Sequence, residues 1–148
     1  MRAFITAMAF TSMVCASPVQ AQSPENQVRE AIADMTRAAA KLDADAFMHS
    51  YWRSPDLAIT FDGETMRGWD TILREQRKWW SDKSADTKFQ DTRPPEIVAQ
   101  GNDVVTSVQW MQVTSAGGRP PAKLVITSVW RKLPEGWRVV LAYESLSP

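Results

Sequence analysis

The 148-residue chain has one cysteine, Cys15, and one histidine, His49. A lone cysteine cannot form an internal disulfide, and one cysteine with one histidine falls short of the ligands of a usual zinc site. The sequence also contains no Gly-x-Gly-x-x-Gly motif, phosphate-binding loop or Gly-x-Ser-x-Gly motif. We therefore expect no metal site, no cofactor and no disulfide.

An excess of charge of one sign is also missing, because 17 Lys and Arg residues balance 17 Asp and Glu residues. This balance argues against nucleic acid or an anionic membrane as the main partner. Long apolar runs are absent from the rest of the chain once residues 3–16 are set aside. That run is too short to span a bilayer.

The apolar run follows Arg2 and precedes the small-residue pattern Val19-Gln20-Ala21. This order is typical of a secretory signal peptide. We expect cleavage near Ala21, so that residues 1–21 are lost and residues 22–148 form one secreted or periplasmic domain, free of the membrane. The alternatives are a retained membrane anchor or a lipid anchor on Cys15, although Val14 stands where a lipid anchor normally needs a small residue.

Three helices are expected in the first half of this domain. Ser23-Pro24-Glu25 is a helix-start signal, and apolar residues recur at helical spacing from Val28 to Leu42. A second, short helix over residues 44–52 follows Asp43, and a third begins at Trp69 and runs to residue 80. A hairpin of strands 57–61 and 64–67 separates the last two helices.

The second half reads as a meander of strands at residues 86–100, 104–115, 122–133 and 137–146. Helices on one side of an antiparallel sheet define an α+β fold. On the last strand, alternation places Leu141 and Tyr143 on one face and Glu144 on the other, unless a bulge re-aims Glu144. The strand after Asp103 carries apolar side chains on both faces. The outer face is therefore either covered by a second copy of the chain in a homodimer or exposed to solvent.

The segments "SPDLAITFDGETMRGWDTI" and "VWRKLPEGWRVV", in this order and spacing, resemble the nuclear transport factor 2-like superfamily, in its SnoaL-like and ketosteroid-isomerase-like branch. The resemblance implies a cone, in which a curved antiparallel sheet wraps around three N-terminal helices and leaves an internal apolar cavity. It also implies dimerisation through the sheet. Members include isomerases, dehydratases, cyclases and epoxide hydrolases, besides binding and assembly modules.

The chain departs from this family at the last strand. Relatives often end "WRIVHDHSS", whereas this chain reads "WRVVLAYES", so that Leu141 and Tyr143 replace two histidines. If the protein is an enzyme, the resemblance implies cofactor-independent isomerase or lyase chemistry, with Tyr143 acting beside His49 or a re-aimed acid such as Glu144. His49 lies between Asp45 and Arg53 at helical spacing, which also fits a solvated helix face.

Aromatic residues from several elements are the main signal for a ligand site. In the family's cone they would converge on the cavity and line it for a small apolar or aromatic molecule: Tyr51, Trp52, Phe61, Trp69, Trp80, Trp110 and Tyr143. A solid aromatic core is the alternative. Trp79 and Trp130 are expected at outer or dimer-facing surfaces, and Trp137 in the core.

These observations favour an exported small-molecule-binding protein with an aromatic-lined cavity. One alternative is a cavity enzyme of the isomerase or dehydratase type. The other is a non-catalytic dimeric assembly module that uses the outer sheet face, around Met111 and Trp130.

Overall fold

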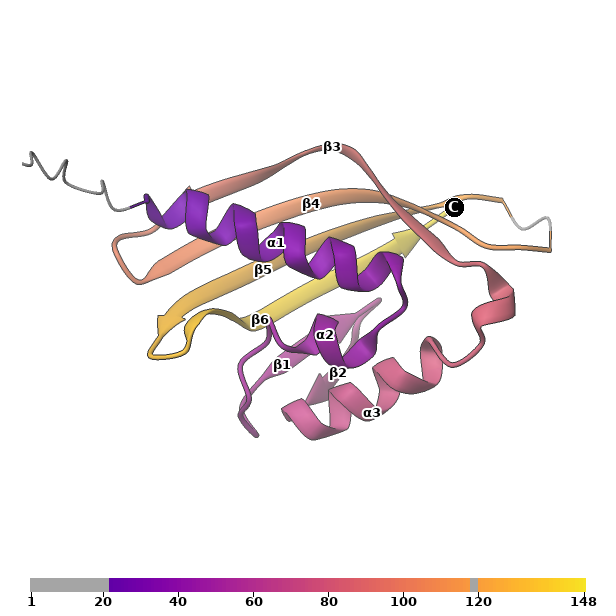
Figure 1. Ribbon diagram of the computed structural model, residues 1–148, viewed down its shortest axis with the longest axis horizontal. Helices are drawn as coiled ribbons and strands as arrows, with labels where there is room; N and C mark the ends of the chain where they lie inside the picture. Colours follow the sequence, from indigo (N-terminus) through magenta and orange to yellow (C-terminus); the bar gives the residue numbers. More distant parts are fainter. Residues whose placement is uncertain (1–21, 118–119) are drawn as a thin grey trace, which may run out of the picture.

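A computed structural model describes residues 22–117 and 120–148 (Figure 1). The predicted signal peptide, residues 1–21, lies outside the described residues and stays a prediction. Within the described part of the chain, no helix is both long enough and apolar enough to cross a membrane.

Three helices form where caps and spacing predict them: α1 (Pro24–Ala40), α2 (Ala44–Met48) and α3 (Trp69–Trp79). Ser23 Oγ accepts the Asn26 N–H at the start of α1, and the Asp43 carboxylate accepts the Ala46 N–H at the start of α2. The helix α2 is shorter than predicted, because the next segment pairs with a strand. Val139 donates its N–H to Ser50 and accepts the Trp52 N–H, each over 2.9 Å.

Six strands form one sheet: β1 (Ala58–Phe61), β2 (Glu64–Arg67), β3 (Lys88–Ala99), β4 (Val104–Thr114), β5 (Ala122–Leu133) and β6 (Gly136–Ser147). Their order is β2-β1-β6-β5-β4-β3. The sheet is mixed rather than purely antiparallel as expected, because β1 pairs with β6 in parallel. The chain already runs beside β6 at the Tyr51–Val139 bridge, and β1 continues in that direction.

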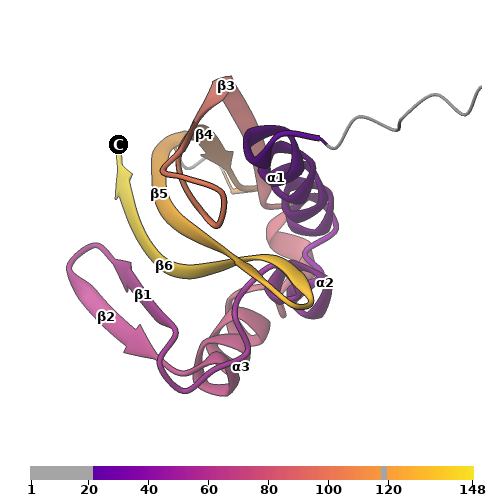
Figure 2. The same cartoon turned by 90° about the vertical axis from the view of Figure 1, so that its left-hand side faces the viewer.

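The sheet is curved and does not close. Figure 2 shows β3 to β6 curling in an open arc, with α1 lying across the open side and α3 below β6. This α+β arrangement of a curved sheet around three helices confirms the predicted fold class.

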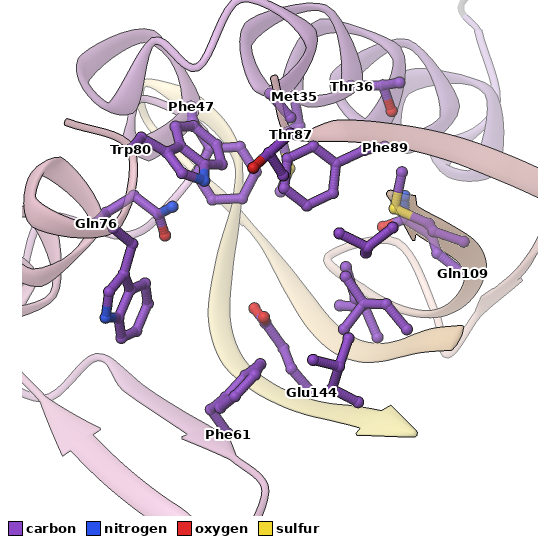
Figure 3. A pocket seen from close by; sticks show the side chains of 17 residues that line it. Met35, Thr36, Phe47, Phe61, Gln76, Trp80, Thr87, Phe89, Gln109 and Glu144 are labelled. Atoms are coloured by element: carbon purple, nitrogen blue, oxygen red, sulfur yellow. The ribbon is translucent and has the colours of Figure 1, made fainter. Parts of the chain in front are cut away.

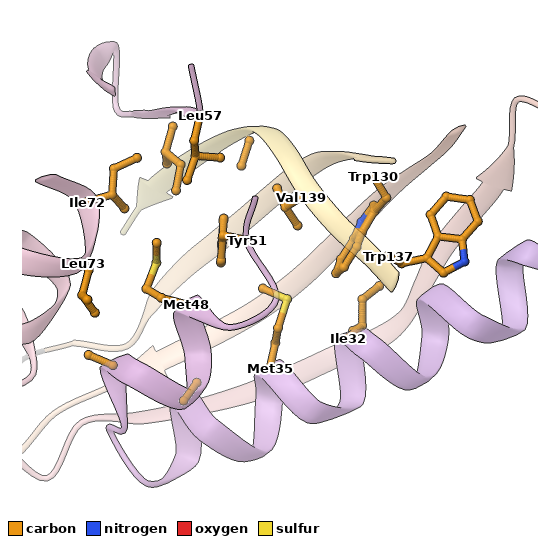
Figure 4. Packing of buried hydrophobic residues seen from close by; sticks show 14 of the residues in the cluster. Ile32, Met35, Met48, Tyr51, Leu57, Ile72, Leu73, Trp130, Trp137 and Val139 are labelled. Carbon is orange, nitrogen blue, oxygen red and sulfur yellow. The ribbon is translucent and has the colours of Figure 1, made fainter. Parts of the chain in front are cut away.

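The core fills the space between α1, α2, α3 and the inner face of the sheet (Figure 4). Trp130 is fully buried there, and its indole N–H donates to Ser107 Oγ over 2.9 Å. Trp137 is also buried, as predicted. The expectation that Trp130 and Met111 lie on the outer face is wrong, because both point inward from β5 and β4.

A bulge in β6 decides which side chains enter the interior. Trp130 pairs with Val139, but the preceding residue Val129 pairs with Leu141, so Val140 is an extra residue in β6. The side chains of β6 that point inward are therefore odd-numbered before the bulge and even-numbered after it: Val139 is buried before the bulge, and Ala142 is buried after it. Glu144 follows Ala142 on the inner face, because side chains alternate along a strand.

Candidate functional site

A cavity of about 520 Å³ lies between the helices and the inner face of the sheet (Figure 3). Its floor is a small apolar cluster of Met111, Leu124 and Ile126 on β4 and β5. The cavity opens toward solvent where Trp79 and Leu146 line it, since these side chains are 53% and 41% exposed. Residues from all three helices and from four strands or their flanks complete the wall: Met35, Thr36, Ala39, Phe47, Phe61, Gln76, Trp80, Thr87, Phe89, Gln109, Val113 and Glu144.

Aromatic rings make up much of this wall. Trp80 stands edge-on to Phe47 with ring centres 5.0 Å apart, and it meets Phe89 at 5.9 Å. Phe61 and Trp79 pair at 6.2 Å. Such tilted and edge-on pairs are the geometry that aromatic quadrupoles favour. The rings brace one another, so the wall can stay open rather than collapse onto the floor.

Among the residues that the structure describes, Glu144 is the one ionisable side chain in the cavity wall. The sheet fixes its position, because it lies opposite Phe61 of β1 and Ile126 of β5, which are also wall residues. Burial raises the pKa of Glu144 to about 7, because an apolar surrounding disfavours the charged carboxylate. Near neutral pH the group therefore occupies both protonation states in comparable amounts.

Two neutral amides accompany this carboxyl group. Gln76 of α3 and Gln109 of β4 are buried, with exposed fractions of 8% and 5%. Figure 3 shows the carboxyl group of Glu144 reaching into the cavity, with Gln76 and Trp80 across from it. Within the described residues, no side-chain hydrogen bond or ion pair involves Glu144, Gln76 or Gln109. Their polar atoms are therefore free to meet a molecule in the cavity.

Tyr51 lies behind the cavity wall and does not form part of it. Its ring packs against Phe47 at 5.4 Å, and its hydroxyl group is buried without a hydrogen-bond partner among the described residues. Burial, and second the negative charge of Glu144, raise the pKa of Tyr51 well above its usual value. Tyr51 is therefore a neutral neighbour of Glu144.

The seven aromatic residues predicted to line a cavity fall into three groups. Phe61 and Trp80 are in the wall. Tyr51 is in the solid core, so the alternative of an aromatic core holds for this part of the molecule. The other four, Trp52, Trp69, Trp110 and Tyr143, lie outside the wall. Whether any wall residue binds a ligand stays a prediction.

The positions of Trp69 and Trp110 have clear physical reasons. The indole N–H of Trp69 donates to the Met48 carbonyl over 3.0 Å, which ties α3 to α2, and Arg53 lies 4.8 Å from the centre of the ring. Trp110 lies on the opposite face of β4 from the floor residue Met111, beneath the guanidinium group of Arg93. Both rings have partners of their own, away from the cavity.

The expectation that Tyr143 points into the cavity is wrong, since the bulge turns it outward and leaves it 50% exposed. His49 does not line the cavity either: it ends α2, is exposed, and lines a separate hollow with Asp34 and Glu135. The site residues that sequence reasoning did not select are Gln76, Gln109 and, except through the possibility of a bulge, Glu144. Nothing in the pattern "WRVVLAYES" marks Val140 as the extra residue.

Three helices pack against a curved sheet that does not close, and the cavity lies between the helices and the sheet. This arrangement is an α+β fold of the cone type. The family model of the SnoaL-like domain matches residues 28–147, and the chain belongs to this family. The sequence finds no match among curated proteins.

Solved structures of several bacterial proteins show the same fold. An NTF-2 like protein of unknown function from Shewanella oneidensis MR-1 superposes with a TM-score of 0.74 at 22% identity, over 82% of this chain and 98% of that one. A nuclear transport factor 2 (NTF2-like) superfamily protein from Salmonella enterica gives 0.70 at 20% identity, over 84% and 90%. A candidate dehydratase of the NTF2-like family from Streptomyces avermitilis gives 0.69 at 18%, over 82% and 94%. At these identities the likeness concerns the fold.

Proposed function

We propose that the protein binds a small, largely apolar molecule in the cavity, with the polar end of that molecule at Glu144. The observation that carries this proposal is a single carboxyl group among the described lining residues of a largely apolar and aromatic cavity of about 520 Å³. Small-molecule sites have volumes of roughly 300–1,000 Å³, apolar walls and a few convergent polar groups. Gln76 and Gln109 supply the further polar contacts that would orient the ligand.

A second candidate function is proton transfer by Glu144, in an isomerase or lyase that needs no cofactor. The specific observation in its favour is the pKa of about 7, where a carboxyl group can both accept and return a proton near neutral pH. A developing enolate oxygen would need a donor, and the side-chain amides of Gln76 and Gln109 are available in the wall. Tyr143 and His49 are exposed and do not line the cavity, so they are not placed to serve.

Export and dimerisation belong to the same proposal. A signal peptide would deliver the domain to the periplasm or the exterior. A second copy would cover the outer sheet face, which carries the exposed apolar side chains of Val98 and Leu141 and the ring of Tyr143. Burying such groups in a homodimer is favourable, because the apolar surface leaves water. A non-catalytic assembly module would use the same face.

The binding proposal is tested by titrating the protein with prodan, an uncharged dye whose emission depends on its surroundings. A saturable blue shift is expected for the natural sequence and is lost in Leu124→Trp, which fills the floor of the cavity. Trp110→Phe, on the opposite face of the sheet, serves as the matched control and keeps the response. The proposal fails if prodan does not saturate, or if Leu124→Trp binds it as well as the natural sequence does.

A further inference from the structure

The described residues of the cavity wall can carry negative charge only. Within residues 22–117 and 120–148, Glu144 brings the one carboxyl group to the wall, and no lysine, arginine or histidine lines it. The strands beside Glu144 contribute Phe61 and Ile126, and the helices contribute Met35, Phe47 and Gln76, with neutral Tyr51 behind them. An ionised Glu144 therefore has no counter-charge from the described residues of the wall. Low-dielectric surroundings make such an unpaired carboxylate costly unless a cation comes to it.

The rest of the wall also suits a cation. Faces of tryptophan and phenylalanine rings attract ammonium groups through their quadrupoles, most strongly where water is excluded. Trp79, Trp80, Phe61 and Phe89 bring such rings to the same cavity wall as Glu144. The same wall is unfavourable for an anion, because neither a cationic side chain nor a metal-ligating cluster occurs in it among the described residues.

We propose that the ligand is a protonated hydrophobic amine. Its ammonium group lies against the carboxylate of Glu144, and its apolar body lies on the floor made by Met111, Leu124 and Ile126. This inference rests on the proposed binding function and adds the chemical class of the ligand. The side-chain oxygens of Gln76 and Gln109 accept the remaining N–H groups, because an ammonium group donates up to three hydrogen bonds. Fatty acids and other carboxylates are disfavoured, because the ionised form of Glu144 repels them.

Protonation of Glu144 gives this class of ligand a pH dependence. A bound ammonium group stabilises the carboxylate, so amine affinity increases as pH rises through about 7. A neutral ligand that accepts a hydrogen bond from protonated Glu144 shows the opposite trend. The direction of the pH dependence therefore separates an amine from a ketone or an ester.

Three probes of similar size and different charge test the inference by calorimetry: 2-phenylethylamine, 2-phenylethanol and phenylacetate. The amine is expected to bind at least about tenfold more tightly than the alcohol, with phenylacetate weakest, because the desolvated ion pair and the rings add to the apolar contact. In Glu144→Gln, amine affinity is expected to fall to about that of the alcohol, so that the preference for the amine over the alcohol is lost. Glu135→Gln, an exposed glutamate in the β5–β6 turn, is the matched control and keeps the amine preference.

The outcomes separate the two proposals. If the alcohol binds as tightly as the amine, or if Glu144→Gln keeps the amine preference, the amine inference is overturned and the cavity remains a binding site. If amine affinity falls with rising pH, the inference is overturned in the same way. If none of the three probes binds and prodan also fails, both proposals are overturned. A cooperative urea-unfolding transition of Glu144→Gln shows that this variant is folded, so that loss of the amine preference reports on the carboxylate.

Discussion

Ionisation of Glu144 is expected to destabilise the folded protein as pH rises. Its pKa is raised from 4.5 to about 7 in the folded state, so the folded chain binds a proton more tightly than the unfolded chain does. The stabilisation from this proton is complete below about pH 4.5 and is lost as pH rises through about 7. Each pKa unit corresponds to about 1.4 kcal/mol, so complete ionisation costs the folded state about 3 kcal/mol.

Glu144→Gln removes this titration and keeps the shape of the side chain. The free energy of unfolding, from urea titrations, is compared for the natural sequence and the variant at several pH values. From about pH 5 to about pH 8 the difference, variant minus natural sequence, is expected to grow by about 2.5 kcal/mol. Other carboxyl groups titrate equally in both proteins and cancel in the difference.

Glu135→Gln is the matched control, and its difference from the natural sequence is expected to stay flat over the same range. A flat difference for Glu144→Gln would refute the reasoning, because Glu144 would then titrate alike in the folded and unfolded chain. A difference that shrinks with rising pH would also refute it, since Glu144 would then have a cationic partner in the cavity that holds it ionised.

Tyr51→Phe is expected to raise the free energy of unfolding by about 1 kcal/mol in urea titrations, because the buried hydroxyl group has no partner; destabilisation would show that this group is hydrogen-bonded. Trp79→Ala is expected to weaken prodan binding several-fold with a change in stability below about 0.5 kcal/mol, since its ring is 53% exposed at the rim; unchanged dye affinity would remove Trp79 from the site. Leu141→Asp is expected to convert the proposed homodimer into a monomer in analytical ultracentrifugation; a dimer that persists would place the interface elsewhere.

Most of the fold could be predicted from local sequence signals. Ser23 and Asp43 cap helices as their side chains predict, and the spacing from Val28 to Ala39 gives the buried face of α1. The hairpin at Asp62-Gly63 and the meander after residue 86 also form. The parallel pairing of β1 with β6 was not predicted, because hairpin logic applies to neighbours in sequence and these strands are far apart in the chain.

The candidate site was harder to predict because it depends on one extra residue. Strict alternation from Trp137 sends Tyr143 inward and Glu144 outward, whereas the bulge at Val140 gives the reverse. A bulge is a compromise between the twist of two long strands and their register, and no single residue type requires it here. The aromatic wall was located in part, because Phe61 and Trp80 reach it, while Trp69 finds a hydrogen bond to Met48 that only the packed helices provide.

The measurement that tests the central claim most directly is a pH titration of the Glu144 side-chain carboxyl carbon by ¹³C NMR, assigned with Glu144→Gln, with and without 2-phenylethanol. A midpoint near 7 that moves when the probe is added is the predicted result, because the carboxyl group lies in an apolar cavity and contacts the molecule that enters it. A midpoint near 4.5, unaffected by the probe, would contradict the account, since Glu144 would then face water rather than a binding cavity.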